Sequence, residues 1–437
     1  MKWFFPALIL LIAALVFDLG LMAYAMYALL GAILASRLIT QTWTENLAGE
    51  RRCNRLSLNV GEQVAVVVSV ENRGRVPVAW VLIEDLLPRH ALVHRPPKIK
   101  LHGSRLQLAM LRRGGRKTFP YQIEFNQRGY YQIGPLVLET GDPFGLHRRW
   151  QTAAEPHFVL VYPEVVPLAG YDVASRRPIG EVRMTHRLFE DPTRISGVRA
   201  YQPGDPMNRV HWRATARTGA LHSKVYEPSS IAGATIVLEF NQAAFDPSHE
   251  PYRSELAVTA AASLANALYL MNQQVGLVTN GRDAADRIRR EGWDPDPRSR
   301  KAAQRSREML AASTRLMPQV VNTCRGPEQL MRILETLARV ESTDGLTFAQ
   351  LVLETSARMP RDASVLAILP SASAETAVAL GGLRRQGFAV EAIVVAYYDH
   401  EFLRAAGDLL AEGVAARQLR DREGIATICR EFVLSRK

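Results

Sequence analysis

The chain has 437 residues, too many for one ordinary domain, so two or three domains are expected. Hydrophobic residues make up 47% and charged residues 22%, which excludes a collagen-like or largely disordered chain. The three cysteines lie far apart and exclude a disulfide-stapled fold or a cysteine-based metal cluster. The net charge of +11 is uneven, because residues 1–233 hold 29 basic and 18 acidic residues and the remainder holds 25 of each. The basic half predicts contact with a membrane surface, a nucleic acid or an acidic protein.

An apolar segment opens the chain. Between residues 3 and 36 the only charged residue is Asp18. As one helix this stretch would be roughly 50 Å long, whereas a bilayer core is about 30 Å thick. The sequence therefore predicts a transmembrane hairpin over residues 1–36, with two short spans that meet near Asp18. A single span is the alternative, and a cleaved signal peptide is disfavoured because its apolar region would be only about 7–15 residues long.

Basic residues stand on both sides of this segment. Lys2 precedes it, and Arg37 and further arginines follow within residues 37–55, which we interpret as a juxtamembrane linker. Positive charge at both ends of a hairpin favours a cytoplasmic position for both ends. The soluble part of the chain is therefore expected in the cytoplasm, with the basic residues close to membrane lipid.

Residues 56–163 are predicted to form an antiparallel β-sandwich. Runs rich in valine or other strand-forming residues recur every 8–14 residues or so, and glycine-containing turns separate most of them. The runs are Gln63–Glu71, Val76–Glu84, Leu106–Leu111, Lys117–Phe125 and Tyr130–Glu139. They carry no catalytic constellation, so we interpret this region as a spacer or interaction module. The basic run at 112–117 is typical of a solvated turn, with phosphate binding as the alternative.

Residues 233–437 alternate between apolar runs and helical patterns. This alternation predicts a doubly wound α/β domain with a parallel or mostly parallel sheet and helices on both faces. In such sheets, ligands gather outside the carboxyl ends of the strands. Strands are predicted near residues 234–240, 275–279, 364–369, 389–396 and 414–419, and helices near 253–272, 300–312, 327–340 and 347–359.

The predicted linker at 164–232 holds the most distinctive pattern in the chain. It reads Gly-x-Arg-x-Tyr-x-x-Gly-Asp and then Arg-x-x-Trp-x-x-Thr-Ala-Arg. We interpret it as a clasp between two domains in which the aspartate pairs with an arginine, and a surface for an acidic partner or phosphate is the alternative. The residues are Gly197, Arg199, Tyr201, Gly204, Asp205, Arg209, Trp212, Thr215, Ala216 and Arg217.

This signature resembles the bacterial family called domain of unknown function 58. The run Asp142-Pro143-Phe144-Gly145-Leu146 and the order of the parts match that family as well. The resemblance implies a C-terminal domain similar to von Willebrand factor type A. It also implies partners, namely a MoxR-type AAA+ ATPase and possible transglutaminase-like membrane proteins. On this basis the chain is expected to be a non-enzymatic adaptor or scaffold in the bacterial inner membrane.

Type A domains often carry a metal-ion-dependent adhesion site, with Asp-x-Ser-x-Ser after the first strand, a loop threonine and a later aspartate. Here the first element falls at Glu239–Ala243, where Glu239 and Asn241 replace the aspartate and the first serine. Thr347 matches the loop threonine, and Pro370-Ser371 stands where the later aspartate is expected. Mg²⁺ needs a fuller set of oxygen ligands, so no metal is expected. Metal-dependent ligand binding or adhesion remains the alternative function.

Catalysis and nucleic-acid binding are less well supported. His211 with Thr215 nearby is the strongest candidate for a base and a nucleophile, and no third group orients them. If the segment is extended, His211 points away from Trp212. The phosphate-binding Gly-x-x-x-x-Gly-Lys loop is absent, and no cofactor is expected. Lipid or an acidic protein accounts for the basic half more economically than a nucleic acid.

Overall fold

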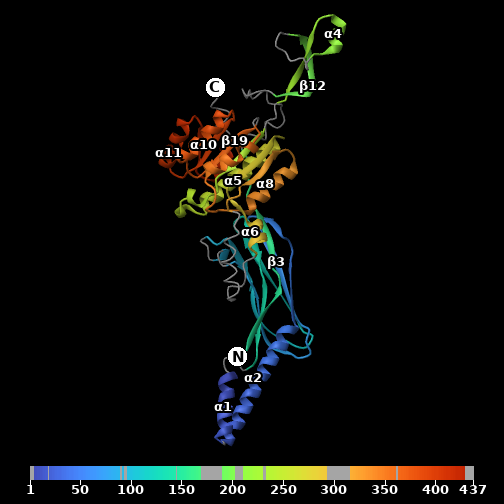
Figure 1. Cartoon of the computed structure of the whole chain (residues 1–437), viewed down its shortest axis with the longest axis vertical. Helices are drawn as coiled ribbons and strands as arrows, with labels where there is room; N and C mark the ends of the chain where they lie inside the picture. Colours follow the sequence, from blue (N-terminus) through green and yellow to red (C-terminus); the bar gives the residue numbers. More distant parts are fainter. Residues whose placement is uncertain are drawn as a thin grey trace. The chain divides into compact units, whose positions relative to one another are not determined.

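The structure is a computed structural model that describes residues 4–17, 19–88, 91–92, 96–143, 145–168, 189–201, 210–229, 233–292, 315–360 and 363–428. The chain divides into two compact units (Figure 1). The first, the β-rich unit, comprises Met1–Glu164 and Ala284–Thr314. The second, the α/β unit, comprises Val165–Asp283 and Arg315–Lys437.

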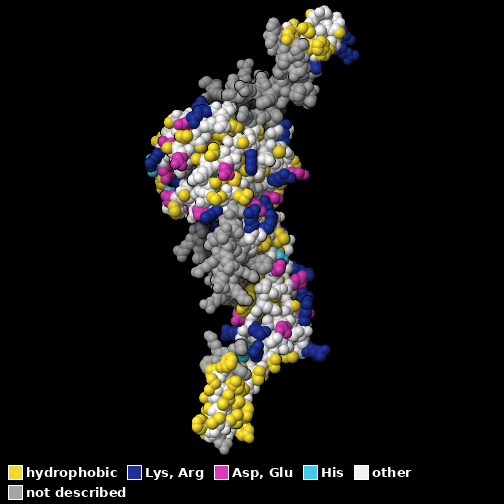
Figure 2. Space-filling view, viewed as in Figure 1, with side chains coloured by type: hydrophobic (Ala, Val, Ile, Leu, Met, Phe, Trp, Pro, Cys, Tyr) yellow, Lys and Arg dark blue, Asp and Glu magenta, His cyan; other side chains and the backbone are white. Residues whose placement is uncertain are grey.

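Two apolar helices, α1 (Phe4–Val16) and α2 (Gly20–Asn46), begin the β-rich unit. They form a helical hairpin whose second helix runs beyond the predicted bound at residue 36, and they pack through a small cluster that includes Leu11, Ala14 and Ala23. Many of their other large apolar side chains face outward, and Figure 2 shows them covering this end of the unit. By length and composition α2 can cross a membrane, whereas α1 has only 13 residues.

The predicted linker at 37–55 is helix and strand in the structure. Helix α2 continues to Asn46, and β1 (Leu47–Cys53) follows with no intervening loop. Trp43 is buried in the core of the β sheets, and Ser36 Oγ lies 2.7 Å from His147 Nδ1. The prediction of a linker was wrong because it rested on local charge, whereas packing against distant strands orders these residues.

Strands β1 to β11 form three sheets, in the orders β1-β3-β7-β5, β10-β9-β4-β6 and β2-β11-β8. The ladders are antiparallel except for the parallel pair of β2 and β11. The predicted strand Tyr130–Glu139 is divided into β8 and β9, which lie in different sheets. The bounds are β2 (Ser57–Asn59), β3 (Gln63–Asn72), β4 (Val78–Asp85), β5 (Ile99–His102), β6 (Leu106–Leu111), β7 (Arg116–Phe125), β8 (Gly129–Ile133), β9 (Leu136–Gly141), β10 (Arg148–Ala154) and β11 (His157–Tyr162).

Alternation of side chains explains why the two four-stranded sheets pack together. Successive residues of a strand point to opposite faces. In β3 every second residue is therefore fully buried, namely Val64, Val66, Val68 and Val70. These valines share one core with residues of the other sheet, such as Ile83 of β4.

The α/β unit contains the predicted, mostly parallel sheet. Its strand order is β17-β15-β14-β19-β20-β21, which is 3-2-1-4-5-6 when these strands are counted along the chain. Strand β17 is antiparallel to β15 and was not predicted, whereas the other ladders are parallel. The bounds are β14 (Gly233–Leu238), β15 (Gln274–Thr279), β17 (Gln319–Cys324), β19 (Ser364–Leu369), β20 (Val390–Val395) and β21 (Ala415–Leu419), with the short pair β16 (Arg282–Asp283) and β18 (Val340–Glu341) beside them.

Helices cover both faces of this sheet. Ile236 and Leu238 of β14 belong to the core that α5, α8 and α12 close, and Val237 between them belongs to the core of α9, α10 and α11. The bounds are α5 (Tyr252–Leu270), α8 (Pro327–Arg339), α9 (Phe348–Thr355), α10 (Ala374–Arg385), α11 (Asp399–Ala411) and α12 (Arg422–Thr427). Helix α6 (Ala284–Glu291) belongs to the β-rich unit, and the helix predicted at 300–312 lies outside the described residues.

An antiparallel hairpin occupies part of the predicted linker at 164–232. Its strands are β12 (Phe189–Ala200) and β13 (His222–Ser229), and α4 (Trp212–Thr218) lies between them in the chain (Figure 1). We call the described residues 189–201 and 210–229 the signature arm.

Candidate functional site

The signature arm brings the described part of the sequence signature into one hairpin. In the β12–β13 ladder Gly197 pairs with Val225 and Arg199 with Ser223, and the Tyr201 N–H donates to the Leu221 carbonyl at 2.9 Å. Trp212, Thr215 and Arg217 lie on α4. Gly204, Asp205 and Arg209 lie outside the described residues, and so does the predicted pairing of Asp205 with an arginine.

Polar groups of the arm itself hold α4 in place. His211 is its N-cap, and Nδ1 of the ring accepts the backbone N–H of Ala214 at 3.0 Å. Thr215 Oγ1 accepts the backbone N–H of His222 at 3.1 Å. The helix ends at Gly219, which adopts a left-handed φ of 74° that glycine tolerates without strain. Residues 212–218 are thus helical, so the orientation of His211 that an extended segment would give does not apply. His211 and Thr215 each have a structural task.

The arm exposes its aromatic and basic side chains. Trp212 is 64% exposed, and no residue of α4, all of which is described, is buried. The apolar Val198 and Leu221 are also exposed. Among the arm residues whose side chains the structure describes, the charged ones are all basic, namely Arg199, Arg213, Arg217 and Lys224. Tryptophan and arginine are enriched at protein interfaces, so this surface suits an acidic protein partner.

A second candidate site lies at the carboxyl ends of the parallel strands. Strands β14 and β19 are neighbours there, and the chain leaves them toward opposite sides of the sheet, which is where doubly wound folds bind ligands. Glu239 follows β14 and is only 4% exposed. Asn280 follows β15, and its Nδ2 donates to Glu239 Oε1 at 3.0 Å and to the Leu346 carbonyl at 2.8 Å. Its Oδ1 accepts the Phe240 N–H at 2.6 Å.

Asn241 fixes the same loops from the other side. Its Nδ2 donates to the carbonyls of Leu346 and Gly345, at 3.0 and 3.2 Å, and its Oδ1 accepts the Ala243 N–H at 2.9 Å. Both polar atoms of this amide group therefore form hydrogen bonds with the main chain. Sequence reasoning selected Glu239 and Asn241 but missed Asn280, whose position becomes apparent only when β15 is placed beside β14.

Thr347 is a helix cap. Its Oγ1 accepts the backbone N–H of Gln350 at 3.4 Å, and Gln350 Oε1 accepts the Thr347 N–H at 3.0 Å, which completes a capping box for α9. In the part of the chain that the structure describes, no group of three or more His, Cys, Asp or Glu side chains is placed to hold a metal ion. The three residues of the degenerate metal pattern instead join loops and start a helix.

Burial controls the charge of Glu239. It raises the pKa of the carboxyl group to about 7, although hydrogen bonds from the Asn280 side chain and from the Asn241 backbone act in the opposite direction. The carboxyl group is therefore partly protonated at neutral pH. A protonated carboxyl group is a poor ligand for Mg²⁺, which prefers anionic oxygen.

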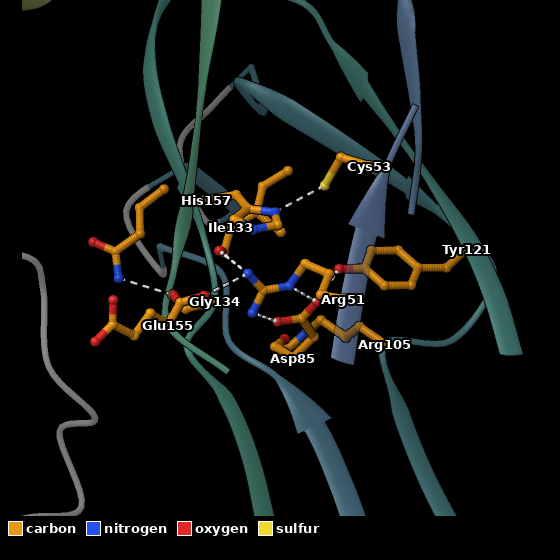
Figure 3. Close-up of polar contacts among 10 residues, drawn as sticks. Arg51, Cys53, Asp85, Arg105, Tyr121, Ile133, Gly134, Glu155 and His157 are labelled. Carbon is orange, nitrogen blue, oxygen red and sulfur yellow. Dashed lines mark hydrogen bonds and ion pairs between the residues drawn. The ribbon is translucent and has the colours of Figure 1, made fainter. Parts of the chain in front are cut away.

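A third cluster, which sequence reasoning missed, lies inside the β-rich unit (Figure 3). Arg51 of β1 forms a two-pronged ion pair with Asp85 of β4, with Nε–Oδ2 and Nη2–Oδ1 distances of 2.8 Å. Both side chains are fully buried. The Tyr121 hydroxyl donates to Asp85 Oδ2 at 2.6 Å, so the carboxylate accepts from two side chains.

A third guanidinium nitrogen of Arg51, Nη1, reaches the main chain. Nη1 donates to the carbonyls of Ile133 and Glu155 at 2.8 and 3.0 Å (Figure 3). Gly134 has a φ of 101°, and a Cβ atom there would collide with the Arg51 guanidinium. Nearby, burial raises the pKa of the Cys53 thiol to about 11, which keeps it protonated and unreactive. This cluster fastens strands β1 and β4 to each other and to the main chain at Ile133 and Glu155.

Comparison with known proteins places these features in a family. The model of the family described as protein of unknown function DUF58 matches residues 197–349. Through this region the chain belongs to the DUF58 family. The matched region contains the whole signature from Gly197 to Arg217, together with Glu239, Asn241, Asn280 and Thr347, so the DUF58 assignment made from the signature is confirmed.

A curated relative is the uncharacterized protein YeaD of Bacillus subtilis (strain 168), 24% identical over 262 residues. The match covers 60% of this chain and less than two thirds, 62%, of YeaD. Among solved structures, the VWA domain of SpRpn10 covers 46% of this chain and 94% of its own, with 10% identity and a TM-score of 0.28. The CARDB domain of PF1109 from Pyrococcus furiosus covers 26% and 91%, with 14% identity and a TM-score of 0.19. At such low TM-scores neither structure supports a conclusion about the fold or the function of this DUF58 chain.

Proposed function

We propose that this DUF58 protein is a non-enzymatic adaptor anchored in the cytoplasmic (inner) membrane. Its soluble units lie in the cytoplasm, and the signature arm recruits a MoxR-type AAA+ ATPase. The α/β unit is of the von Willebrand factor A type, and a transglutaminase-like membrane protein is a further partner. The observation that carries the proposal is the 64% exposure of Trp212, a signature residue, on an arm whose described charged side chains are all basic.

The exposure of Trp212 supports a binding role because exposure removes the ordinary structural reason for a tryptophan. A tryptophan in a core contributes through burial, whereas this one adds little to the stability of the arm. Buried against a partner, the same ring would contribute strongly to binding, and the arginines around it would select an acidic surface.

The apolar helices support the membrane anchor. Helix α2 passes the length and hydropathy criteria for a membrane span. Helix α1, with 13 residues, is roughly 20 Å long and would require local thinning of the bilayer. The outward-facing Ile9, Leu10 and Leu21 are 66%, 45% and 89% exposed, and such a surface is stable only when lipid or protein covers it.

Metal-dependent ligand binding gains no support from the geometry. Asn241 Oδ1 and Thr347 Oγ1 already accept backbone N–H groups, and Glu239 is partly protonated at neutral pH. His211 and Thr215 give no support to an enzymatic function, because both side chains hold the arm together.

Affinity capture of the membrane-extracted full chain tests the proposal, with ATP, ADP or a non-hydrolysable analogue present. We expect an AAA+ ATPase to co-purify in a nucleotide-dependent yield. Trp212→Ala should lower its affinity roughly 30-fold, as expected for a hot-spot side chain worth about 2 kcal/mol. The control is Tyr252→Ala, which removes an equally exposed aromatic ring from α5. Absence of an ATPase in every nucleotide state would refute the adaptor function. If Trp212→Ala and Tyr252→Ala capture the ATPase equally well, the role of Trp212 is refuted.

A further inference from the structure

Within the described part of residues 1–164 of the β-rich unit, five arginines are exposed and unpaired. Each of them is at least partly surrounded by solvent, and none forms an ion pair or side-chain hydrogen bond with another described residue. Their neighbours Arg73, Arg116 and Arg148, in contrast, lie within 4 Å of an acidic side chain. We call these five residues the basic rim: Arg37, Arg75, Arg112, Arg113 and Arg149.

Two turns bring three of these arginines to the end of α2. The N–H of Arg73, in the turn between β3 and β4, donates to the Asn46 carbonyl at 2.9 Å. Asn72 Nδ2 donates to the Arg112 carbonyl at 3.2 Å, which joins this turn to the one between β6 and β7. Arg75, Arg112 and Arg113 therefore gather beside the last residue of α2.

The other two arginines lie closer to the apolar part of the hairpin. Arg37 follows Ser36, whose hydroxyl group contacts His147 at 2.7 Å, and Arg149 lies two residues beyond His147. Ser36 precedes Asn46 by about 15 Å along the helix axis. Figure 2 shows basic side chains at the end of the β-rich unit from which the apolar helices emerge.

Apolar side chains accompany the rim. Trp150, next to Arg149, is 47% exposed, and Leu146 is 40% exposed. Tryptophan is enriched at the boundary between lipid tails and head groups, and basic residues there meet lipid phosphates. Arginine pairs with phosphate through two parallel hydrogen bonds. The combination of unpaired arginines, an exposed tryptophan and an adjoining apolar hairpin matches the chemistry of an anionic membrane surface.

We propose that the basic rim binds the phosphate groups of anionic phospholipids and holds the β-rich unit against the membrane surface. The inference rests on the proposed insertion of the apolar hairpin. An acidic protein is a less fitting occupant, because the rim adjoins the helices that lipid would surround. One basic residue near an anionic surface is worth roughly fivefold in association, from about 1 kcal/mol.

Spin-labelled lipids test the rim and the anchor separately. The full chain is reconstituted into phosphatidylcholine bilayers with a trace of spin-labelled phosphatidylcholine or phosphatidylglycerol, and electron paramagnetic resonance measures the motionally restricted fraction of each. The labelled phosphatidylcholine reports insertion of the hairpin. The ratio of the two association constants reports lipid selection, and we expect phosphatidylglycerol to be preferred up to about fivefold at low salt.

Matched variants assign that preference to the rim. The triple variant Arg75→Gln, Arg112→Gln and Arg113→Gln should bring the ratio close to one while phosphatidylcholine remains restricted. The control triple variant, Arg325→Gln, Arg332→Gln and Arg404→Gln, removes the same charge from exposed positions of the α/β unit and should keep the preference.

Three outcomes contradict the inference. If phosphatidylcholine is restricted but phosphatidylglycerol is not preferred, the rim fails and the anchor stands. If neither lipid is restricted, the anchor itself fails. If both triple variants lower the preference equally, net charge rather than the rim selects the lipid.

Discussion

The two units bury charge in opposite ways. In the β-rich unit Arg51 and Asp85 are buried together, and each oxygen of the carboxylate lies 2.8 Å from a guanidinium nitrogen. In the α/β unit Glu239 is buried against amide groups, and no described cationic side chain pairs with it. In the first arrangement each charge depends on its partner, because removal of one leaves the other buried and uncompensated. The stability of the second arrangement depends on whether the carboxyl group carries a proton. The comparison shows that a buried carboxyl group at the carboxyl ends of the strands does not by itself make a metal site.

The largest effect is expected when the ion pair is broken on one side. Arg51→Met leaves the Asp85 carboxylate buried without a cation, and we expect the free energy of unfolding of the β-rich unit to fall by about 3–5 kcal/mol. Chemical unfolding of the detergent-solubilised full chain, followed by hydrogen exchange of the β strands, measures the loss.

The double variant Arg51→Met with Asp85→Leu is the control for this prediction. It removes both charges, so most of the lost stability should return. If the double variant is as unstable as Arg51→Met, the damage comes from lost packing, and the contrast between the two units would lose its electrostatic basis.

A smaller, pH-dependent effect is expected in the α/β unit. The pKa of Glu239 is about 7 in the folded chain, above its ordinary value of 4.5. Between these values the folded chain retains a proton that the unfolded chain has released, so stability falls as pH rises. The loss should reach about 3 kcal/mol and be complete above pH 7. The free energy of unfolding, measured at pH values from 4.5 to 8, gives the slope of stability against pH and tests this prediction.

Glu239→Gln should remove this pH dependence, because an amide does not titrate. The matched control is Glu354→Gln on the exposed side of α9, which should leave the slope of the wild-type chain unchanged. A slope that persists in Glu239→Gln would mean that another group titrates, and the proposed contrast with the ion pair would then be wrong.

The smallest effect concerns the cap of α9. Thr347→Ala removes the Oγ1 that accepts the Gln350 N–H, and we expect a loss of about 1 kcal/mol. The loss should be equal with and without Mg²⁺, since the hydroxyl group serves the helix. Thermal unfolding in both conditions measures it, with Ser373→Ala at the N-cap of α10 as the comparison. Stabilisation by Mg²⁺ that disappears in Thr347→Ala would instead restore the metal site.

Much of the fold could be predicted because alternation and apolar runs are local signals. The prediction located strands β3, β6 and β19 almost to the residue. It also gave a parallel or mostly parallel α/β sheet, although not the order of its strands. Strand β1 was missed because its sequence is charged, and Arg51 fits a strand only once a distant aspartate neutralises it. The polar edge strand β17 was missed for a similar reason, since half of its residues are polar.

The candidate sites were predictable to a different extent. The signature located the arm, since its residue types and spacing are unusual. The sequence contained the threonine and glutamine of the capping box, three residues apart, but the family pattern drew attention to a metal instead. The role of Asn280 could not be predicted, because its partners Glu239 and Leu346 are 41 and 66 residues away in the chain.

The direct passage from α2 into β1 has a mechanical consequence. A flexible tether would let a soluble domain rotate and explore a wide volume above the membrane. Here a helix and a sheet share a core through Trp43, and the chain has no hinge between Asn46 and Leu47. If α2 spans the bilayer as proposed, a tilt of this helix is also a tilt of the strands, and bilayer thickness would set the orientation of the β-rich unit.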